Sequence, residues 1–305
     1  MRRLLVTGER GFVGENITRM RQVLAIGYDW ELFAATTPYD VRDKNTLTSL
    51  IRQVRPDGVI HLAGVSFVPD SFKNPEETYH INFLGTLNLF QALNAEDFSG
   101  RLLYVSSGDV YGLLDSDLLP ATEKHLPRPL NPYAVSKLAA EALAYQWSQA
   151  HRFERVVIAR PFNHVGPGQR ADFVLPSMAR QIVRIRKNLQ PPVLLVGDID
   201  VTRDFLDVKD IVHAYICLLD HGINGQIYNV CSGIETNVRE CIKRMLAIAG
   251  VEAEIQRDPD RMRPVDLRRA VGDNTKLMTD TGWCPAVPLD ESLNNLLNDW
   301  ECRES

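Results

Sequence analysis

Short apolar segments alternate with segments of helical periodicity through the first 160 residues of the chain. The apolar segments stand near residues 3–7, 32–36, 58–62, 102–105 and 155–159. Continuous apolar runs are typical of strands buried on both faces, and parallel strands of this kind are joined by helical crossovers. The alternation therefore predicts an α/β fold with a doubly wound parallel sheet that helices cover on both faces.

A glycine-rich loop follows the first of these strands. It reads Gly8-Glu9-Arg10-Gly11-Phe12-Val13-Gly14, a G-x-x-G-x-x-G pattern that opens a helix. Glycines permit a tight turn and let backbone N–H groups approach a pyrophosphate at the N-terminus of a helix. The spacing is one residue longer than G-x-G-x-x-G, and glycines in such a turn can serve packing alone. The place between a strand and a helix favours a Rossmann-type dinucleotide site.

The second predicted strand ends without the acidic residue that bonds the ribose 2′-hydroxyl of NAD in such folds. Ala34-Ala35-Thr36-Thr37 stand there instead. A 2′-phosphate would meet no repelling charge at these positions, and Arg10 or Arg42 could approach it. Asp40 could contact the adenine instead. We expect NADP(H) as the cofactor, or the use of both NADP(H) and NAD(H).

Beyond residue 160 the predicted strands become shorter and proline and glycine become more frequent. Shorter strand-like segments, near 193–196, 201–205 and 226–230, stand among clusters of proline and glycine. We expect an NAD(P)-binding Rossmann domain over residues 1–160 and a smaller C-terminal substrate-binding α/β lobe over 161–305, interleaved with the first. The site is expected in the cleft between them, outside the carboxyl ends of the strands.

Tyr133 and Lys137 stand four residues apart on a helix predicted over 131–150, so their side chains share one face. A tyrosine of ordinary pKa, about 10, is a poor acid–base catalyst at neutral pH, and a neighbouring ammonium lowers that pKa. Ser106 and Ser107 end the strand at 102–105, where a hydroxyl can donate to a substrate oxygen. A Y-x-x-x-K pair alone is often only helix surface. Together with the glycine loop it predicts an NAD(P)-dependent oxidoreductase.

Composition argues against several other classes of protein. The net charge of −5 and the pI near 5.8 do not suit a general nucleic-acid binder. No apolar run approaches the ~20 residues that span a bilayer, and the N-terminal apolar segment is too short for a signal peptide. The five cysteines show no C-x-x-C spacing and the seven histidines no H-x-x-x-H pair. We expect reduced thiols, no metal site, no membrane partner and a cytoplasmic protein.

Taken together, the motifs resemble those of the extended short-chain dehydrogenase/reductases, the NAD-dependent epimerase/dehydratase family. The resemblance runs through nearly the whole chain. Its motifs lie at 7–14, 40–41, 61–64, 82–86, 106–112, 133–137, 160–163, 203–205, 263–264 and 272–273. Segments 107–112, 160–169 and 197–208 narrow it to the branch that handles GDP-6-deoxyhexoses, where bacterial reductases forming GDP-D-rhamnose are most similar.

The resemblance implies roles for the residues that match the family's motifs. Ser107, Tyr133 and Lys137 are the implied catalytic residues. The implied cofactor-binding residues, besides Tyr133 and Lys137, are Gly8, Arg10, Gly11, Phe12, Val13, Gly14, Asp40, Val41, Leu62, Ala63, Gly64 and Pro161. The implied substrate-binding residues, besides Ser107, are Asp109, Asn163, Arg180, Arg203, Arg263 and Asp266. His164 is expected to be structural rather than a general base.

The implied reaction is the NAD(P)H-dependent reduction of the C4 ketone of GDP-4-keto-6-deoxy-D-mannose to GDP-D-rhamnose. Ser107 would donate a hydrogen bond to O4 as charge develops there, and Tyr133 would give O4 its proton. Lys137 would lower the pKa of Tyr133 and hold the cofactor ribose. Arg203 and Arg263 would clamp the diphosphate.

Other functions stay open. A GDP-mannose 4,6-dehydratase or a sugar epimerase uses the same cofactor motifs, and Asp109 stands two residues after Ser107, where dehydratases place a carboxylate. Reduction on the opposite face of the sugar would give GDP-6-deoxy-D-talose. An inactive NADP-sensing regulator is a third reading, against which the intact Ser107, Tyr133 and Lys137 argue.

The resemblance also implies a homodimer, because family members pair two long helices across a two-fold axis into a four-helix bundle. The matching helices are expected over 76–93 and 131–150. They carry apolar residues beyond one face, for example Leu138, Leu143 and Trp147.

Overall fold

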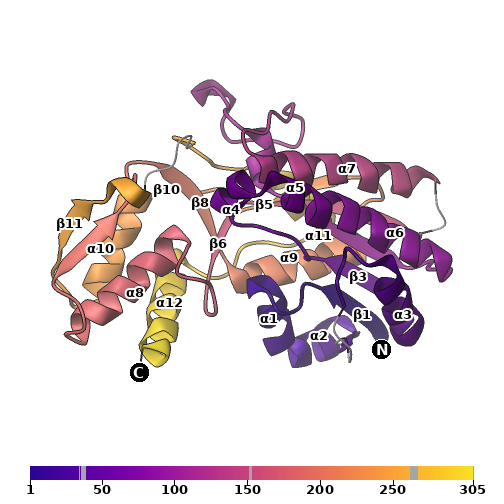
Figure 1. Ribbon diagram of the computed structural model, residues 1–305, viewed down its shortest axis with the longest axis horizontal. Helices are drawn as coiled ribbons and strands as arrows, with labels where there is room; N and C mark the ends of the chain where they lie inside the picture. Colours follow the sequence, from indigo (N-terminus) through magenta and orange to yellow (C-terminus); the bar gives the residue numbers. More distant parts are fainter. Residues whose placement is uncertain (34, 36–38, 151–152, 262–266, 305) are drawn as a thin grey trace.

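The computed structural model describes residues 1–33, 35, 39–150, 153–261 and 267–304. A six-stranded sheet lies at its centre, and all neighbouring strands in it run parallel (Figure 1). In chain order its strands are β1 (Arg2–Thr7), β2 (Trp30–Phe33), β3 (Gly58–His61), β4 (Arg101–Val105), β5 (Arg155–Pro161) and β9 (Ile227–Val230). The predicted α/β class with a doubly wound parallel sheet is confirmed.

The spatial order of the strands is β2-β1-β3-β4-β5-β9. The chain passes from β1 to β2 on one side and then crosses to β3 on the other, so the order reverses between β1 and β3. The loops that follow these two strands therefore leave in opposite directions. Such a switch point opens a crevice at the carboxyl end of the sheet, where ligands of this fold class bind.

Helices cover both faces of the sheet, and each face has its own hydrophobic core. One core includes residues of α1 (Phe12–Arg19), α2 (Arg21–Tyr28), α9 (Val208–His221) and α11 (Thr275–Thr281). The other includes residues of α3 (Lys44–Val54), α6 (Gly85–Ala95) and α7 (Pro132–Ala150). Leu4 and Val6 belong to the first core and Leu5 to the second. Successive strand side chains point to opposite faces, which explains the continuous apolar run of β1.

The helix expected over 76–93 is divided. The short α4 (Val68–Lys73) is followed by α5 (Pro75–Tyr79), a π-helical turn over His80–Leu84 and then α6. Asn82 in this turn is buried; its amide donates to Val65 O at 3.0 Å and to Ser136 Oγ at 2.9 Å. The π-helical turn, a feature often found at functional sites, thus ties the loop after β3 to α7.

Most elements beyond β5 form a smaller group around a third hydrophobic core, drawn away from the large sheet in Figure 1. Its strands are β6 (Asn163–Val165), β7 (Val193–Val196), β8 (Thr202–Asp207), β10 (Glu235–Asn237) and β11 (Glu254–Arg257). They form a three-stranded sheet, β10-β8-β6, and a pair, β11-β7. The helices α8 (Val174–Arg186), α10 (Val238–Ala249) and α12 (Leu289–Arg303) contribute to the same core. Because α9 and β9 return to the large sheet, the second half of the chain contributes to both parts.

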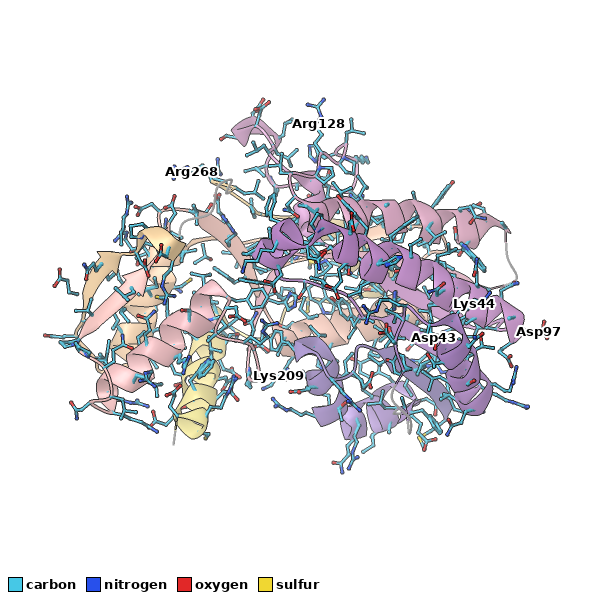
Figure 2. All side chains as sticks on the ribbon, viewed as in Figure 1. Asp43, Lys44, Asp97, Arg128, Lys209 and Arg268 are labelled. Carbon is cyan, nitrogen blue, oxygen red and sulfur yellow. The ribbon has the colours of Figure 1, made fainter. Side chains whose placement is uncertain are left out.

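Short 3-10 turns complete the described elements, at Gly108–Tyr111, Ser116–Leu118 and Pro259–Arg261. The segment between the first of these turns and α7, which carries Arg128, projects from the body of the molecule (Figure 2). Within the described residues, none of the helices combines the length and apolar character needed to cross a membrane.

Candidate active site

A cavity of about 530 Å³ opens at the carboxyl end of the central sheet, and we call it the carboxyl-end cavity. The glycine loop, the ends of β3, β4 and β5, and the first turns of α7 form its walls on one side. Residues of the smaller part, including Phe173, Arg203 and Leu267, line the other side. The predicted site residues that line it are Gly8, Arg10, Gly11, Phe12, Val13, Gly14, Leu62, Gly64, Ser107, Asp109, Tyr133, Lys137, Pro161, Asn163 and Arg203.

Three predicted cofactor residues do not line the cavity. A Cβ at Gly8 would lie 2.7 Å from the backbone nitrogen of Ala63, so Ala63 supports the glycine loop from behind. Val41 is buried against Gly85. The carboxylate of Asp40 accepts three hydrogen bonds from the Arg42 guanidinium, the shortest at 2.6 Å. Hydrogen bonding by the Arg42 side chain is the largest cause of the lowered pKa of Asp40.

Arg180 was predicted to bind substrate, but it does not line the carboxyl-end cavity. Its Nε donates to Glu304 Oε1 at 2.6 Å, and its guanidinium lies 5.6 Å from the ring centroid of Trp300. These partners hold it on the side of α8 that faces the end of α12, away from the carboxyl-end cavity. Arg263 and Asp266 lie outside the described residues.

The glycine loop is closed too tightly for side chains. Gly8 has a positive φ of 78°, and Gly11 N donates to Gly8 O at 3.0 Å. A Cβ at Gly14 would lie 2.5 Å from the Gly8 carbonyl oxygen and 2.6 Å from Glu9 Cα. Among the described residues, no side chain caps the N-terminus of α1, so its first N–H groups face the cavity edge unshielded. This cradle fits the pyrophosphate of a dinucleotide.

Ser107, Tyr133 and Lys137 meet in the same cavity, and all three are buried. Burial is the largest cause that raises the pKa of Tyr133, the Asp109 charge adds to it, and a hydrogen bond with Ser107 opposes it. The expectation that Lys137 depresses this pKa is therefore wrong for the free protein. Burial dominates this pKa, so the phenol stays protonated at neutral pH, as a proton donor must.

Lys137 itself is held by the strand beside it. Its Nζ donates to Val105 O at 2.8 Å and lies 6.0 Å from the ring centroid of Tyr133. Burial lowers the pKa of Lys137 to about 8, and the Glu141 carboxylate opposes that shift. The side chain is therefore mostly an ammonium at pH 7 and loses its charge just above that pH.

His164 stacks its ring on Phe12 of the glycine loop, with centroids 5.8 Å apart and planes 4° apart. Its Nδ1 lies 2.9 Å from Phe162 O, and burial lowers its pKa. The imidazole is thus a neutral packing group that joins β6 to the glycine loop.

Sequence reasoning missed several residues of this site. Phe67 and Phe173 line the cavity from its two sides and contact each other edge to face, with centroids 5.5 Å apart. Glu141 is buried beneath the catalytic residues, where its carboxylate accepts hydrogen bonds from Ser106 and Arg160. An acidic residue on the buried stripe of α7, four positions after Lys137, was the signal that could have revealed it.

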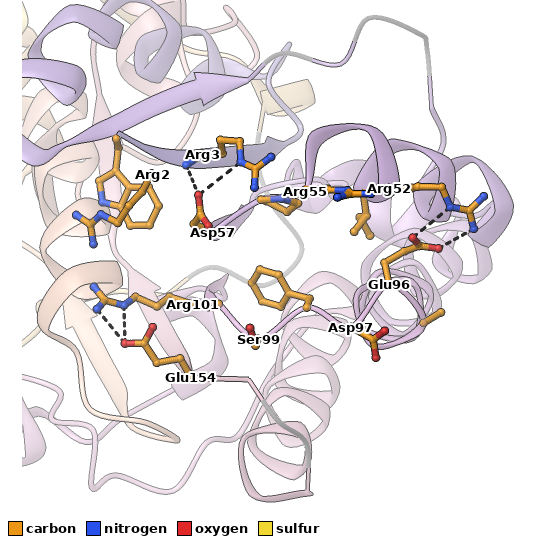
Figure 3. A pocket seen from close by; sticks show the side chains of 16 residues that line it. Arg2, Arg3, Arg52, Arg55, Asp57, Glu96, Asp97, Ser99, Arg101 and Glu154 are labelled. Atoms are coloured by element: carbon orange, nitrogen blue, oxygen red, sulfur yellow. Dashed lines mark hydrogen bonds and ion pairs between the residues drawn. The ribbon is translucent and has the colours of Figure 1, made fainter.

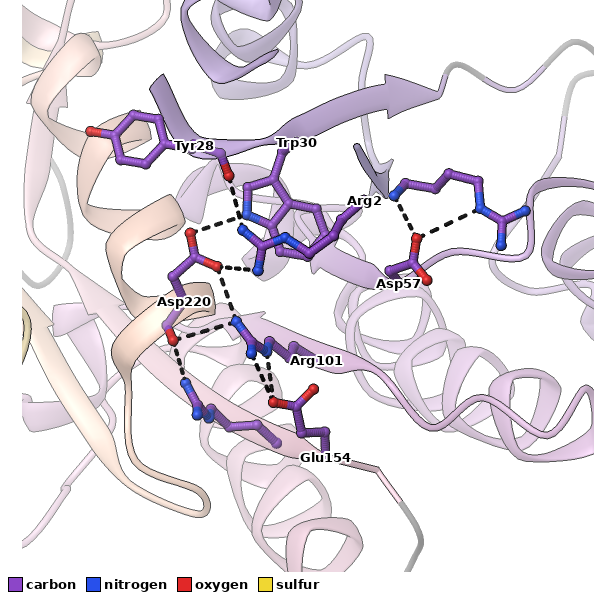
Figure 4. Close-up of polar contacts among 9 residues, drawn as sticks. Arg2, Tyr28, Trp30, Asp57, Arg101, Glu154 and Asp220 are labelled. Atoms are coloured by element: carbon purple, nitrogen blue, oxygen red, sulfur yellow. Dashed lines mark hydrogen bonds and ion pairs between the residues drawn. The ribbon is translucent and has the colours of Figure 1, made fainter. Parts of the chain in front are cut away.

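A second cavity, of about 640 Å³, lies at the amino end of the same sheet, and we call it the amino-end cavity (Figure 3). Its lining includes Arg2, Arg3, Arg52, Arg55 and Arg101. Arg52 pairs with Glu96 at 2.7 Å and Arg101 with Glu154 at 2.9 Å. Figure 4 shows Asp220 accepting from Arg2 at 2.7 Å and from Arg101 at 3.0 Å. These carboxylates already neutralise most of the arginines, so the larger cavity is not the candidate active site.

Comparisons with known proteins agree with this geometry. The family model described as GDP-mannose 4,6 dehydratase matches residues 34–296. The GDP-6-deoxy-D-mannose reductase of Pseudomonas aeruginosa is 50% identical over 301 residues, which cover 99% of this chain and 98% of that protein. The GDP-6-deoxy-D-talose 4-dehydrogenase of Aggregatibacter actinomycetemcomitans is 30% identical over 285 residues, 92% of this chain and 91% of that protein.

A solved structure described as RMD from Pseudomonas aeruginosa complexed with NADPH superposes with a TM-score of 0.93. It is 49% identical to this chain and covers 99% of it, and this chain covers 100% of that one. A putative epimerase from Burkholderia cenocepacia superposes with a TM-score of 0.85 at 33% identity, with 99% and 98% of the two chains covered. The chain thus belongs to the extended short-chain dehydrogenase/reductases, the NAD-dependent epimerase/dehydratase family.

Proposed function

We propose that this chain is an NADPH-dependent reductase that converts the C4 ketone of GDP-4-keto-6-deoxy-D-mannose to the alcohol of GDP-D-rhamnose. The observation that carries this proposal is the 50% identity, over nearly the full length of both chains, to the Pseudomonas aeruginosa GDP-6-deoxy-D-mannose reductase. The catalytic hydroxyls, the phenol and the ammonium that such a reduction needs all line the carboxyl-end cavity.

The glycine loop and the N-terminus of α1 would hold the pyrophosphate of the cofactor, whose nicotinamide supplies a hydride when bound. The Arg10 side chain is 82% exposed at this cavity, where its Nε lies 4.0 Å from the Glu9 carboxylate, and it would turn toward a 2′-phosphate. We expect NADPH to be preferred modestly over NADH, because the sequence carries no acidic residue at positions 34–37, directly after the second strand. The Pseudomonas aeruginosa structure is described with NADPH.

The chain's own residues then complete the reduction. Ser107 Oγ donates a hydrogen bond to the ketone oxygen as negative charge builds there. Tyr133, protonated because burial raises its pKa, gives that oxygen its proton. Lys137 would hold the ribose of a bound cofactor, and its ammonium would stabilise the negative charge left on the Tyr133 phenolate.

Arg203 and Asn163 are the proposed contacts for the substrate diphosphate, and Arg263 and Asp266 remain predicted contacts for the nucleotide. Arg203 Nη1 donates to the carbonyls of Thr202 and Leu267, both at 2.7 Å, which fixes the guanidinium at the cavity wall. A guanidinium held at the cavity wall in this way favours charge-assisted binding of phosphate oxygens. By this proposal residues 1–160 bind most of the cofactor and supply the catalytic residues, and residues 161–305 supply most contacts to the sugar nucleotide.

A 4,6-dehydratase acting on GDP-mannose is the second candidate. Asp109 lines the cavity beside Tyr133, and the matching family model is described by that activity. The reductase is favoured because it needs one hydride, one hydrogen-bond donor and one proton, which the cofactor, Ser107 and Tyr133 supply. We expect Asp109→Asn to keep most of the reductase activity, whereas a dehydratase that depends on this carboxylate would be crippled.

We also propose a cytoplasmic homodimer paired through α5, α6 and α7. Tyr79, Leu84, Val135 and Tyr145 of these helical segments are 37%, 38%, 39% and 55% exposed, which leaves an apolar face to cover. Trp147, which was expected on that face, packs instead against Phe90 with ring centroids 5.4 Å apart. Light scattering at micromolar concentration should give twice the chain mass, and a monomer would contradict the pairing.

Identification of the product tests the proposed reaction. The protein is incubated with GDP-4-keto-6-deoxy-D-mannose and NADPH, and the sugar nucleotide is purified by anion exchange and examined by NMR. We expect the rhamno configuration at C4. The talo configuration would keep the reduction but reverse the face on which the ketone is presented, and an unchanged ketone would remove the proposal.

A further inference from the structure

A buried ion pair lies directly beneath the catalytic residues. Arg160 donates from Nε to Glu141 Oε1 at 2.9 Å and from Nη2 to Glu141 Oε2 at 2.7 Å. The two side chains are 3% and 4% exposed. Ser106 Oγ donates to the same carboxylate at 2.5 Å. Three elements therefore meet at one carboxylate: α7, the end of β4 and the end of β5.

The pair touches both ends of the segment that carries Ser107 and Asp109. Ser106, at one end, is bonded to Glu141, and the ring centroid of Tyr111, at the other end, lies 4.7 Å below the Arg160 guanidinium. Tyr111 OH donates in turn to Asn229 Oδ1 at 2.7 Å. A segment held at both ends presents its central hydroxyl in one orientation, which a hydrogen bond to a developing oxyanion requires.

Helix geometry connects the same carboxylate to the other two catalytic residues. Tyr133, Lys137 and Glu141 follow one another at intervals of four residues on α7, so they share one face of the helix. Neighbours at this spacing lie about 5–6 Å apart at Cβ. The Glu141 carboxylate is thus one helical turn from the Lys137 ammonium and is fixed there by Arg160.

Stability alone is a poor explanation for such a pair. Removing two charges from water costs several kcal/mol per ion, and apolar replacements of buried pairs are often neutral or stabilising. The surrounding core would accept them, because Ala140 and Ala144 of α7 and Ile158 of β5 are apolar and fully packed. The desolvation cost of burying this ion pair indicates that it has a role besides stabilising the fold.

We propose that Glu141 and Arg160 are positioning residues of this active site, which clamp segment 106–111 so that Ser107 is presented and keep a negative charge one turn from Lys137. This inference rests on the proposed function, because it assigns the pair to the reduction step. Neither residue lines the carboxyl-end cavity, so both would act through Ser107 and Lys137.

The sign of the expected pH effect follows from the groups around Lys137. Tyr133 and Glu141 face it from α7, Tyr104 from β4 and His61 from β3. Burial lowers the pKa of His61 to about 3 and raises those of Tyr104 and Tyr133, so these three stay neutral between pH 5 and 9. Lys137, with its pKa lowered to about 8, is the group of this set that changes charge in that window. Loss of the Glu141 charge would lower this pKa further and move the upper pH limit downward.

The test compares Glu141→Gln with the double variant Glu141→Leu/Arg160→Met. The single variant leaves the Arg160 charge buried without its partner and is expected to be less stable. The double variant removes both charges and should recover the wild-type unfolding midpoint to within a few degrees. Glu154→Gln, which breaks the Arg101 pair at the amino end of the sheet, is the matched control and should leave turnover and pH profile unchanged.

Two readouts are taken on each purified protein: kcat against pH with the 4-keto sugar nucleotide, and the affinity for NADPH against pH by fluorescence. For both variants we expect kcat to fall about tenfold, with KM changed much less. We expect the upper pH limit of kcat and of NADPH binding to move down by about one unit. The double variant should show these losses although its stability is restored.

The pair is merely structural if the double variant recovers wild-type kcat and the wild-type pH limit together with its stability. An unshifted pH limit in a folded Glu141→Gln protein would lead to the same conclusion. If the wild-type protein does not reduce the ketone, the proposed function fails, and the pH limit of NADPH binding still decides the role of the pair. If neither variant folds, Ser106→Ala, which leaves the pair intact, decides: a fall in kcat of several-fold supports the clamp, and wild-type kcat contradicts it.

Discussion

The central sheet opens onto a cavity at each of its two ends. The two cavities differ in whether their polar side chains are already paired with other groups of the protein. The amino-end cavity is the larger, at about 640 Å³ against about 530 Å³, and the richer in arginine. Its guanidinium groups are largely paired with carboxylates of the same cavity or with Asp220. The carboxyl-end cavity instead gathers the backbone N–H groups of the glycine loop, serine hydroxyls, two phenols and one ammonium. Convergent and partly unsatisfied groups identify the site, whereas size and charge count do not.

The direction of the helices accounts for much of this difference. In a parallel sheet with crossover helices, helix N-termini gather at the carboxyl end of the strands and helix C-termini at the amino end. α1 begins beside the glycine loop, where its N-terminus favours an anion. α3 and α6 end at Val54 and Ala95 beside the amino-end cavity, where arginines suit the helix carbonyls. The arginines of that cavity therefore have a structural explanation.

The largest effect that the comparison predicts is at Tyr133. Tyr133→Phe removes the proton donor without changing the packing of the ring, so kcat should fall at least about 100-fold. NADPH affinity should barely change, because the phenol is not needed to bind the pyrophosphate. Steady-state kinetics and fluorescence titration measure both quantities, and turnover near that of the wild type would remove Tyr133 from the mechanism.

A smaller effect, a loss of NADPH affinity, is expected for a substitution in the glycine loop. A Cβ at position 14 would lie 2.5 Å from a backbone oxygen, so Gly14→Ala must open the turn, and we expect NADPH to bind about tenfold or more weakly. Gly27→Ala is the matched control, since nothing lies within 4 Å of the added methyl group on α2. Equal affinities in the two variants would contradict the assignment of the loop to the cofactor.

At the amino end the comparison predicts a loss of stability without a loss of catalysis. Asp220 accepts from Arg2, Arg101 and Trp30 Nε1, the last at 3.2 Å (Figure 4). Asp220→Ala should lower the free energy of unfolding by about 2 kcal/mol, less than for a fully buried pair, because both arginines are partly open to water. Thermal unfolding should show a midpoint a few degrees lower, with kcat unchanged below it.

Arg52→Ala provides the control for this end of the sheet, since its side chain is 66% exposed and its pair with Glu96 should matter little. We expect a midpoint that cannot be distinguished from that of the wild type. A loss of turnover in either variant at a temperature where it is folded would show that the amino-end cavity takes part in the reaction, and the contrast between the two ends would break down.

The sequence allowed the sheet and the glycine loop to be predicted because both depend on local pattern. The run at Leu4, Leu5 and Val6 has to be buried on two faces, and Gly14 has to approach a backbone. Tyr133 and Lys137 were found because four residues make nearly one helical turn. Arg180 was misplaced because spacing shows that a residue lies on a helix but not which neighbour that face meets.

The features that could not be predicted depend on contacts formed only in the folded chain. The link between Glu141 and Arg160 joins residues 19 apart through a helix and a strand that meet only in the folded chain. The depressed pKa expected for Tyr133 was wrong because burial, which no local pattern reports, raises the pKa of this phenol. The π-helical turn at Asn82 was hidden in a continuous helical pattern for the same reason.

The amount of NADPH consumed for each product molecule distinguishes a reductase from a dehydratase. One sample contains the protein, GDP-4-keto-6-deoxy-D-mannose and NADPH; the other contains the protein, GDP-mannose and a catalytic amount of NADP⁺. We expect one NADPH to be consumed for each reduced sugar nucleotide in the first sample, and no 4-keto product in the second. Formation of the 4-keto sugar from GDP-mannose without net use of NADPH would contradict the reductase and would make Asp109 a catalytic residue of a dehydratase.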